Sequence, residues 1–252
     1  MDTNKNTPVD LFGLASYGDA LKVVVEKTFS GAEALLGRIC LPAAEELGLM
    51  FRDKVRHWRL KNVIDTLQKA EDKLEFRSDK LEIKAHPRVI HSIIENASME
   101  DNSAMQDLWA GLIAASCSSS EPSDDNMIYI ETLKQLTQTE ARILEYWAKW
   151  SPKQFDKLGL IKTDKGIIMP ADKFFEIVQS SQLDKLNSEI SHLRGLDLVE
   201  QGFGLASGFF YEDDIVHPDK LKVGLKISPL ALALYARAQG HAGDIATYYI
   251  VN

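Results

Sequence analysis

The chain has 252 residues, 45% hydrophobic and 26% charged, an ordinary composition for a protein that buries a sizeable core. Its formal net charge of -8 excludes a global attraction to nucleic acid, so any such contact needs a local basic patch. No run of about 18 apolar residues occurs, which excludes an ordinary transmembrane helix. Cys40 and Cys117 have no metal-binding spacing and the first residues lack a signal-peptide pattern, so we expect a cytoplasmic protein with reduced thiols.

The first part of the chain, residues 11–38, predicts one or two helices after a flexible stretch over residues 1–10. Leu21, Val24 and Val25 lie at helical spacing in a segment rich in alanine, glycine, valine and leucine. Two interpretations stay open: helices that pack inside the protein, or an amphipathic segment that contacts a membrane. The acidic side chains of the segment count against contact with an anionic membrane.

A long helix is predicted from Pro42 to about residue 75. Its second half carries an apolar stripe at spacings of three and four residues, which consists of Leu60, Val63, Leu67, Ala70 and Leu74. A helix of this length needs a packing partner, because its propensity alone would not stabilise it. The stripe therefore predicts either a contact within the chain or a homo-oligomer formed through the long helix.

A basic run lies in the middle of this helix, over residues 52–61. The candidate contacts to nucleic acid or to an anionic surface are Arg52, Arg56, Arg59 and Lys61. The favoured alternative is a solvated helix face beside a buried Trp58, with nearby acidic residues offsetting the charge.

Two apolar helices follow, joined by a polar bend over residues 97–105 (ASMEDNSAM). Pro87 is expected in the first turn of the first helix, and Ser103 with Gln106 predicts a capping box for the second. The second helix has a wide apolar stripe that includes Trp109. Its small residues, which would let another helix approach closely, are Ala110, Gly111, Ala114 and Ala115.

The acids of the bend region, Glu100, Asp101 and Asp107, admit two interpretations. They could form a metal or general-base site. The favoured interpretation is that Glu100 and Asp101 satisfy the bend and the start of the next helix. The six histidines are scattered, and no nucleotide-binding, zinc-protease or hydrolase motif occurs. We therefore expect no catalytic, cofactor-binding or metal-binding residues, no cofactor and no enzymatic activity.

From residue 137 the pattern becomes mixed. Thr137 and Glu140 predict a capping box for a helix that is expected to bury Trp147 and Trp150. A short strand is expected at 167–169, followed by a helix after Pro170. The next helix is expected from Ser181, buries Leu183 and ends at Gly195. Strands at 197–201 and 222–228 and a last helix capped by Ser228 complete the pattern.

This order of helices and strands is typical of a winged helix, whose third helix reads DNA. The candidate nucleic-acid contacts there are Lys185 and Arg194, with Glu189 expected among the exposed positions. Because this supply of cations is thin, we favour a protein-interaction scaffold over DNA binding.

The predicted fold class is mainly α, with an N-terminal helical bundle followed by a winged-helix-like α+β domain. The predicted divisions are a flexible N-terminus (1–10), a helical domain (11–136), a winged-helix-like domain (137–240) and a C-terminal tail (241–252).

Three stretches together resemble the Abi-alpha family, which is associated with abortive infection, a bacterial response to phage. They are LPAAEELGLMFRDKVRHWRLKNV, ASMEDNSAMQDLWAGLIAAS and IETLKQLTQTEARILEYW, within a resemblance that covers roughly residues 40–237. The resemblance implies a role in anti-phage defence and carries over no catalytic residue. Three hypotheses follow: a sensor or adaptor that binds a phage or host protein, a toxic effector that acts on the membrane through residues 11–38, and a DNA-binding regulator.

Overall fold

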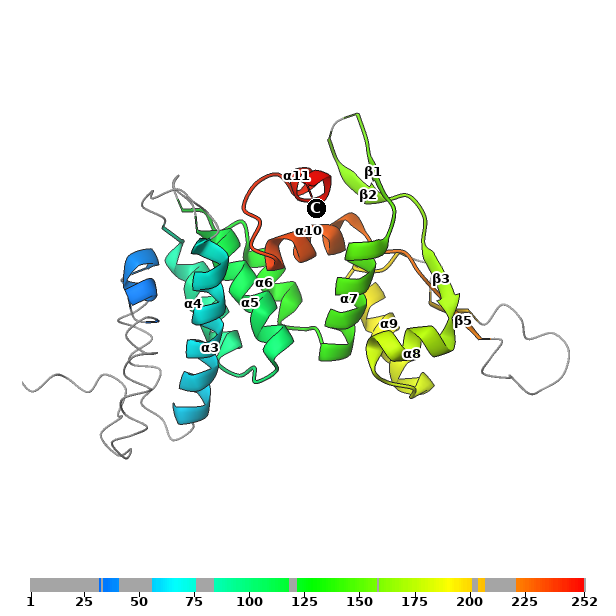
Figure 1. Ribbon diagram of the computed structural model, residues 1–252, viewed down its shortest axis with the longest axis horizontal. Helices are drawn as coiled ribbons and strands as arrows, with labels where there is room; N and C mark the ends of the chain where they lie inside the picture. Colours follow the sequence, from blue (N-terminus) through cyan, green and yellow to red (C-terminus); the bar gives the residue numbers. More distant parts are fainter. Residues whose placement is uncertain are drawn as a thin grey trace, which may run out of the picture.

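The computed structural model describes residues 32, 34–40, 56–75, 84–117, 122–157, 159–200, 204–206 and 221–251 (Figure 1). The predictions for residues 1–10, for most of 11–38 and for the first half of the long helix lie outside these residues.

The described chain is mainly helical, and its strands are confined to residues 153–225, as the predicted fold class requires. The helices are α3 (Arg56–Glu75), α4 (Pro87–Ala97), α5 (Ser103–Ser116), α6 (Met127–Leu133), α7 (Gln138–Trp150), α8 (Ala171–Val178), α9 (Leu183–Gly195), α10 (Pro229–Ala238) and α11 (Ile245–Val251). The strands are β1 (Lys153–Phe155), β2 (Ile161–Thr163), β3 (Ile167–Pro170), β4 (Gly204–Ala206) and β5 (Lys222–Leu225).

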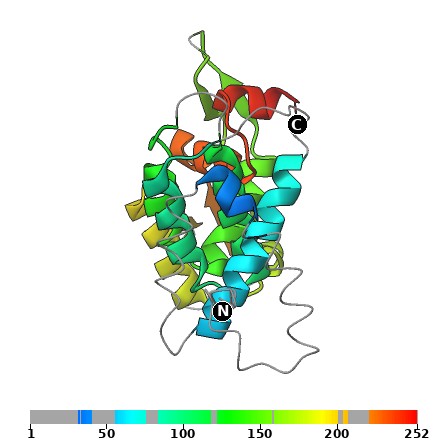
Figure 2. The same ribbon diagram turned by 90° about the vertical axis from the view of Figure 1, so that its left-hand side faces the viewer.

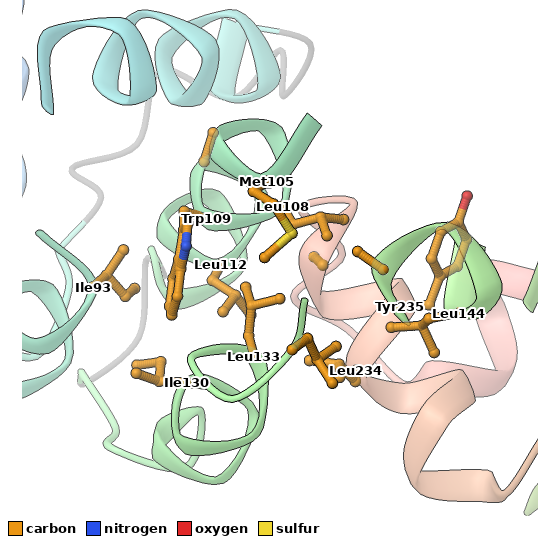
Figure 3. Close-up of a cluster of buried hydrophobic side chains, with 14 of the residues drawn as sticks. Ile93, Met105, Leu108, Trp109, Leu112, Ile130, Leu133, Leu144, Leu234 and Tyr235 are labelled. Carbon is orange, nitrogen blue, oxygen red and sulfur yellow. The ribbon is translucent and has the colours of Figure 1, made fainter. Parts of the chain in front are cut away.

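Helix α5 is the centre of the helical part and packs against α3, α4, α7 and α10. All five residues of the predicted α3 stripe are buried, and α3 lies along α5, so the stripe is covered within the chain. Figure 3 shows Trp109 of α5 among side chains from α4 and α6, with Leu234 and Tyr235 of α10 further along the same cluster. One continuous core thus runs from the N-terminal helices into the C-terminal part.

The close approach predicted for the small residues of α5 occurs at Gly111. A Cβ atom built there would lie 1.6 Å from the backbone oxygen of Ala238, at the end of α10. Only a residue without a side chain lets the two backbones meet in this way.

Three sheet pairings occur among the described residues of the C-terminal part. Strand β5 lies between β3 and β4, antiparallel to both, and β1 pairs with β2 in a separate hairpin. The predicted strands near 167–169 and 222–228 are confirmed. The strand predicted at 197–201 is not seen over its described part, residues 197–200, where Val199 makes only an isolated bridge to Ile227. The β1–β2 hairpin lies where we predicted mainly a connection.

Two predicted caps are confirmed and two are wrong. The Thr137–Glu140 capping box is present, and the Ser228 hydroxyl accepts a hydrogen bond from the backbone of α10. Helix α5 is capped by Asn102 and not by Ser103, because Asn102 Oδ1 accepts hydrogen bonds from the backbone N–H groups of Ala104 and Met105. Gly195 does not make the left-handed turn after α9; Asp197 does, at φ 58°.

Three aromatic or aliphatic side chains predicted to be buried are exposed: Trp58 (39%), Trp150 (64%) and Leu183 (43%). Trp58 is two residues before Leu60 and therefore lies about 200° around the helix from the buried stripe. Trp150 and Leu183 are terminal residues of α7 and α9, where the helix extends beyond the core that it packs on.

Helix α11 packs on α10 through tyrosines. The Tyr249 hydroxyl donates a hydrogen bond to the Leu232 carbonyl at 2.8 Å, and the rings of Tyr235 and Tyr248 meet edge to face. Burial, with a smaller effect from Tyr248, raises the pKa of the phenol groups of Tyr235 and Tyr249.

We predict that Gly111→Ala destabilises the protein by about 3 kcal/mol, because the added methyl group overlaps the Ala238 carbonyl. Thermal and chemical unfolding measure the loss. Gly195→Ala is the matched control, since no atom lies within 4 Å of its Cβ position, and it should be neutral or slightly stabilising. Equal stability of the two variants would contradict the close contact.

We also predict that the free energy of unfolding falls as the pH rises above about 10, the pKa of tyrosine in an unfolded chain. The raised pKa of Tyr249 means that the neutral phenol is favoured in the folded state, so its contribution is present below that pH and is lost above it. Tyr249→Phe should reduce the loss between pH 9 and pH 11 by about 1 kcal/mol, measured by urea unfolding at both pH values.

Candidate functional site

A polar groove opens between the bend before α5, the start of α7 and the connection from α8 to α9. Its volume is about 770 Å³. The residues that line this polar groove are Glu100, Leu136, Thr137, Gln138, Thr139, Arg142, Gln179, Ser180, Ser181, Gln182, Lys185 and Glu189. A second hollow of about 480 Å³ adjoins it, since Gln138 and Arg142 line both, and extends along α5 towards Lys69 of α3.

Two buried carboxylates, Glu140 and Glu189, are joined through Thr137. Glu189 and Thr137 line the polar groove, and Glu140 lies behind them. The Thr137 hydroxyl donates to Glu189 Oε1 at 3.2 Å and accepts from the Glu140 backbone N–H at 3.2 Å. Glu140 Oε2 accepts from the Thr137 backbone N–H at 2.8 Å, and Glu140 Oε1 lies 2.7 Å from His192 Nδ1. Because a carboxylate oxygen only accepts, the imidazole Nδ1 donates. This network ties the start of α7 to α9.

Glu189 was predicted at an exposed position, and this prediction is wrong. Its side chain is only 7% exposed, because it turns back towards Thr137. Glu189 Oε2 has no hydrogen-bond partner among the described residues, and the nearest cation, Lys185 Nζ, lies 3.9 Å from Oε1. The polar groove therefore includes a carboxylate with unused capacity to accept a hydrogen bond.

The connection from α8 to α9 completes the polar groove. It begins at Gln179, which has a left-handed backbone at φ 56°, and runs through Ser180 and Ser181 to Gln182. Arg142 of α7 holds this segment in place, because its Nη1 donates to the Val178 carbonyl at 3.1 Å.

The candidate contacts to nucleic acid or to an anionic surface do not form one patch in the described part of the chain. Arg52 and the side chain of Arg56 lie outside the described residues. Arg59 is half-buried and donates to the Ser98 hydroxyl at 3.0 Å, whereas Lys61 is exposed on α3. The other two candidates, exposed Lys185 and half-buried Arg194, lie on α9. Helices α5 and α7 lie between α3 and α9 (Figure 1), so the two pairs are separated.

Among the acids of the bend region, Glu100 bonds to the backbone and Asp107 to a neighbouring helix. Glu100 Oε1 accepts from the Asn102 backbone N–H at 2.8 Å, and this confirms its predicted role at the bend. Asp107 pairs with Lys73 of α3 at 3.1 Å. Among the residues that the structure describes, no group of three or more His, Cys, Asp or Glu side chains could hold a metal ion.

The polar groove was not predicted from the sequence. Thr137 and Glu140 were predicted as a helix cap, but their partners, Glu189 and His192, lie 52 residues further along the chain. The polar run over residues 179–182 was the one local signal, and it is equally typical of a surface loop.

The fold and the polar groove define a mainly helical protein with a small C-terminal sheet and a hydrogen-bonding cleft between its helices. The family model for abortive infection alpha matches residues 59–226, which include every element from α4 to α9. The chain belongs to the abortive infection alpha family, as the sequence resemblance implied, and this membership connects it with defence by abortive infection. No curated protein and no solved structure matches the chain. No helix in the described part is both long and apolar enough to cross a membrane.

We predict that His192→Ala lowers the free energy of unfolding by about 1–2 kcal/mol, because the fully buried Glu140 loses one of its hydrogen-bond donors. Urea unfolding at pH 7 measures the difference. Ser191→Ala, at the exposed neighbouring position on α9, is the control and should change stability by less than about 0.5 kcal/mol. A His192→Ala variant as stable as this control would contradict the role of the imidazole.

Proposed function

We propose that this protein acts in anti-phage defence as a non-enzymatic sensor or adaptor in the cytoplasm. In this proposal a phage or host protein binds in the polar groove. Family membership supports the defence role, and the groove supports the mode of binding.

The observation that carries the proposal is the chemistry of the groove lining. Small-molecule sites are lined mainly by apolar side chains with a few polar groups. Here eleven of the twelve lining residues are polar or charged, and Leu136 is the exception. Amide side chains such as Gln138, Gln179 and Gln182 both donate and accept, so they suit the alternating N–H and C=O groups of a bound polypeptide.

The buried network supports a binding role rather than a catalytic one. Both oxygens of Glu140 are occupied, one by His192 and the other by the Thr137 backbone N–H. A general base must reach a proton of its substrate, and a carboxylate that is fully buried and doubly hydrogen-bonded is poorly placed for that task.

A plaque assay with a steric variant tests the proposal. Ser181→Arg places a long cationic side chain at an exposed position of the groove lining. We expect it to block the partner and to abolish protection against phages that the wild-type protein restricts, with culture survival at high phage dose as the readout.

Ser191→Arg is the matched control, because Ser191 is exposed on α9 and does not line the groove. It should protect as well as the wild type does. If both variants fold and protect fully, the groove is not the partner site. If both lose protection equally, the effect is not specific to the groove.

A DNA-binding regulator is the second candidate. It is favoured by the order α7, β3, α8, α9, β4, β5, which the β1–β2 hairpin interrupts after α7, and by the central position of β5, since a winged helix has this order and pairing. Helix α9 would then be the reading helix, but Lys185 lies close to the acidic Glu189 there. Duplex binding at low salt that disappears in Lys185→Glu with Arg194→Glu would favour this candidate.

A further inference from the structure

The β1–β2 hairpin projects from one side of the molecule, above α10 in both views and near α11 (Figures 1 and 2). Its strands pair from Lys153 opposite Thr163 to Phe155 opposite Ile161. Asp156 closes the turn, since its carboxylate and its backbone carbonyl accept hydrogen bonds from the Leu160 and Gly159 N–H groups at 2.8 and 3.2 Å. Gly159 supplies the left-handed backbone that this turn requires, at φ 82°.

One face of the hairpin anchors it to the protein. Ile161 and Thr163 alternate inward, and the Thr163 hydroxyl donates to the Ile227 carbonyl at 2.8 Å. Lys153 lies over the ring of Tyr249, 5.1 Å from its centre, and donates to the Lys149 carbonyl at 2.8 Å. These contacts fix the direction in which the outer side chains point.

The exposed side chains of the hairpin combine large apolar groups with lysines. Leu160 is 65% exposed at the tip, and Trp150 is 64% exposed at the base. Phe155, opposite Ile161 on the anchored face, is still 41% exposed because it lies at the tip end of its strand. Residues 149–165 contain five lysines against two aspartates, an excess of three positive charges in a chain whose net charge is -8. The exposed lysines are Lys149, Lys157, Lys162 and Lys165.

We propose that this hairpin is a contact site for an anionic lipid bilayer. Phe155 and Leu160 enter the headgroup region, Trp150 lies at the interface, and the lysines bind lipid phosphates. Exposed apolar side chains surrounded by lysines are the combination that interfacial binding requires, because burial of the apolar groups and attraction to anionic lipid add together. The proposal does not depend on the polar groove.

The shape of the hairpin favours a membrane over other partners. A stable protein interface buries about 800 Å² on each side, and a two-stranded tip of three-residue strands offers far less. A nucleic acid would contact the lysines but leave Leu160 and Phe155 in water. A bilayer accepts both kinds of side chain.

Co-sedimentation of the full chain with lipid vesicles tests the proposal. We expect binding to vesicles of phosphatidylcholine with phosphatidylglycerol, little binding to pure phosphatidylcholine, and weaker binding at high salt. Lys157→Glu with Lys162→Glu should weaken binding about 30-fold or more, since each lysine near an anionic surface is worth roughly a factor of five. Leu160→Ser should weaken it as well, without any change in charge.

Lys134→Glu with Lys173→Glu is the charge-matched control, because both lysines are exposed and lie outside the hairpin. This control should bind nearly as well as the wild type. Absence of binding to anionic vesicles would overturn the proposal. Equal losses in the two charge-reversed variants, or an unchanged Leu160→Ser variant, would also overturn it, since either result indicates attraction to anionic lipid that the hairpin does not direct.

Discussion

At Gly111 the backbone of α5 meets the Ala238 carbonyl at the end of α10 with no side chain between them. This contact joins α5, at the centre of the helical part, to α10 in the C-terminal part, and the elements between them in the chain must fit around it. Helix α10 also packs on α7 and β2, so the positions of α7 and of the β1–β2 hairpin follow from the same approach. A methyl group at Gly111 would push α10 away and would disturb the core on both sides.

The position of α7 follows from this arrangement. It also determines where the polar groove and the β1–β2 hairpin lie. Trp147 fixes the helix from inside, because its ring is fully buried and its Nε1 donates to the Leu225 carbonyl of β5 at 3.1 Å. At the start of the helix, Thr137 and Glu140 reach α9 through Glu189 and His192. A capping box that needs only local residues thereby also serves as a link between two helices. The polar groove exists because this link holds α9 and the connection from α8 next to the bend before α5.

The periodic parts of the fold could be predicted from the sequence, because burial at every third or fourth residue is a local property. The stripe of α3, the core faces of α4 and α5, and the small residues that admit α10 all followed from such spacing. Errors gathered at helix ends, where periodicity has too few residues to act on: Trp150, Leu183 and the cap of α5 are examples. The β1–β2 hairpin was missed because each of its strands has only three residues.

The polar groove could not be predicted in the same way, because its defining contacts join residues about 50 positions apart. Nothing near Glu189 in the sequence indicates that its carboxylate turns inward to Thr137. In the sequence Glu189 is only the residue before the buried Ile190. A buried carboxylate with an unsatisfied oxygen lowers the stability of the fold. Such a residue therefore indicates a candidate site once the structure shows it.

Helix α7 also separates the two surfaces for which we propose binding. Thr137 and Gln138, at its first turn, line the polar groove, whereas Trp150, at its last residue, adjoins the hairpin. A helix of 13 residues is about 20 Å long. A partner in the groove and a bilayer at the hairpin would therefore not compete for space. Because α7 is anchored by Trp147 between its two ends, it would hold a bound protein at a fixed distance from the membrane surface.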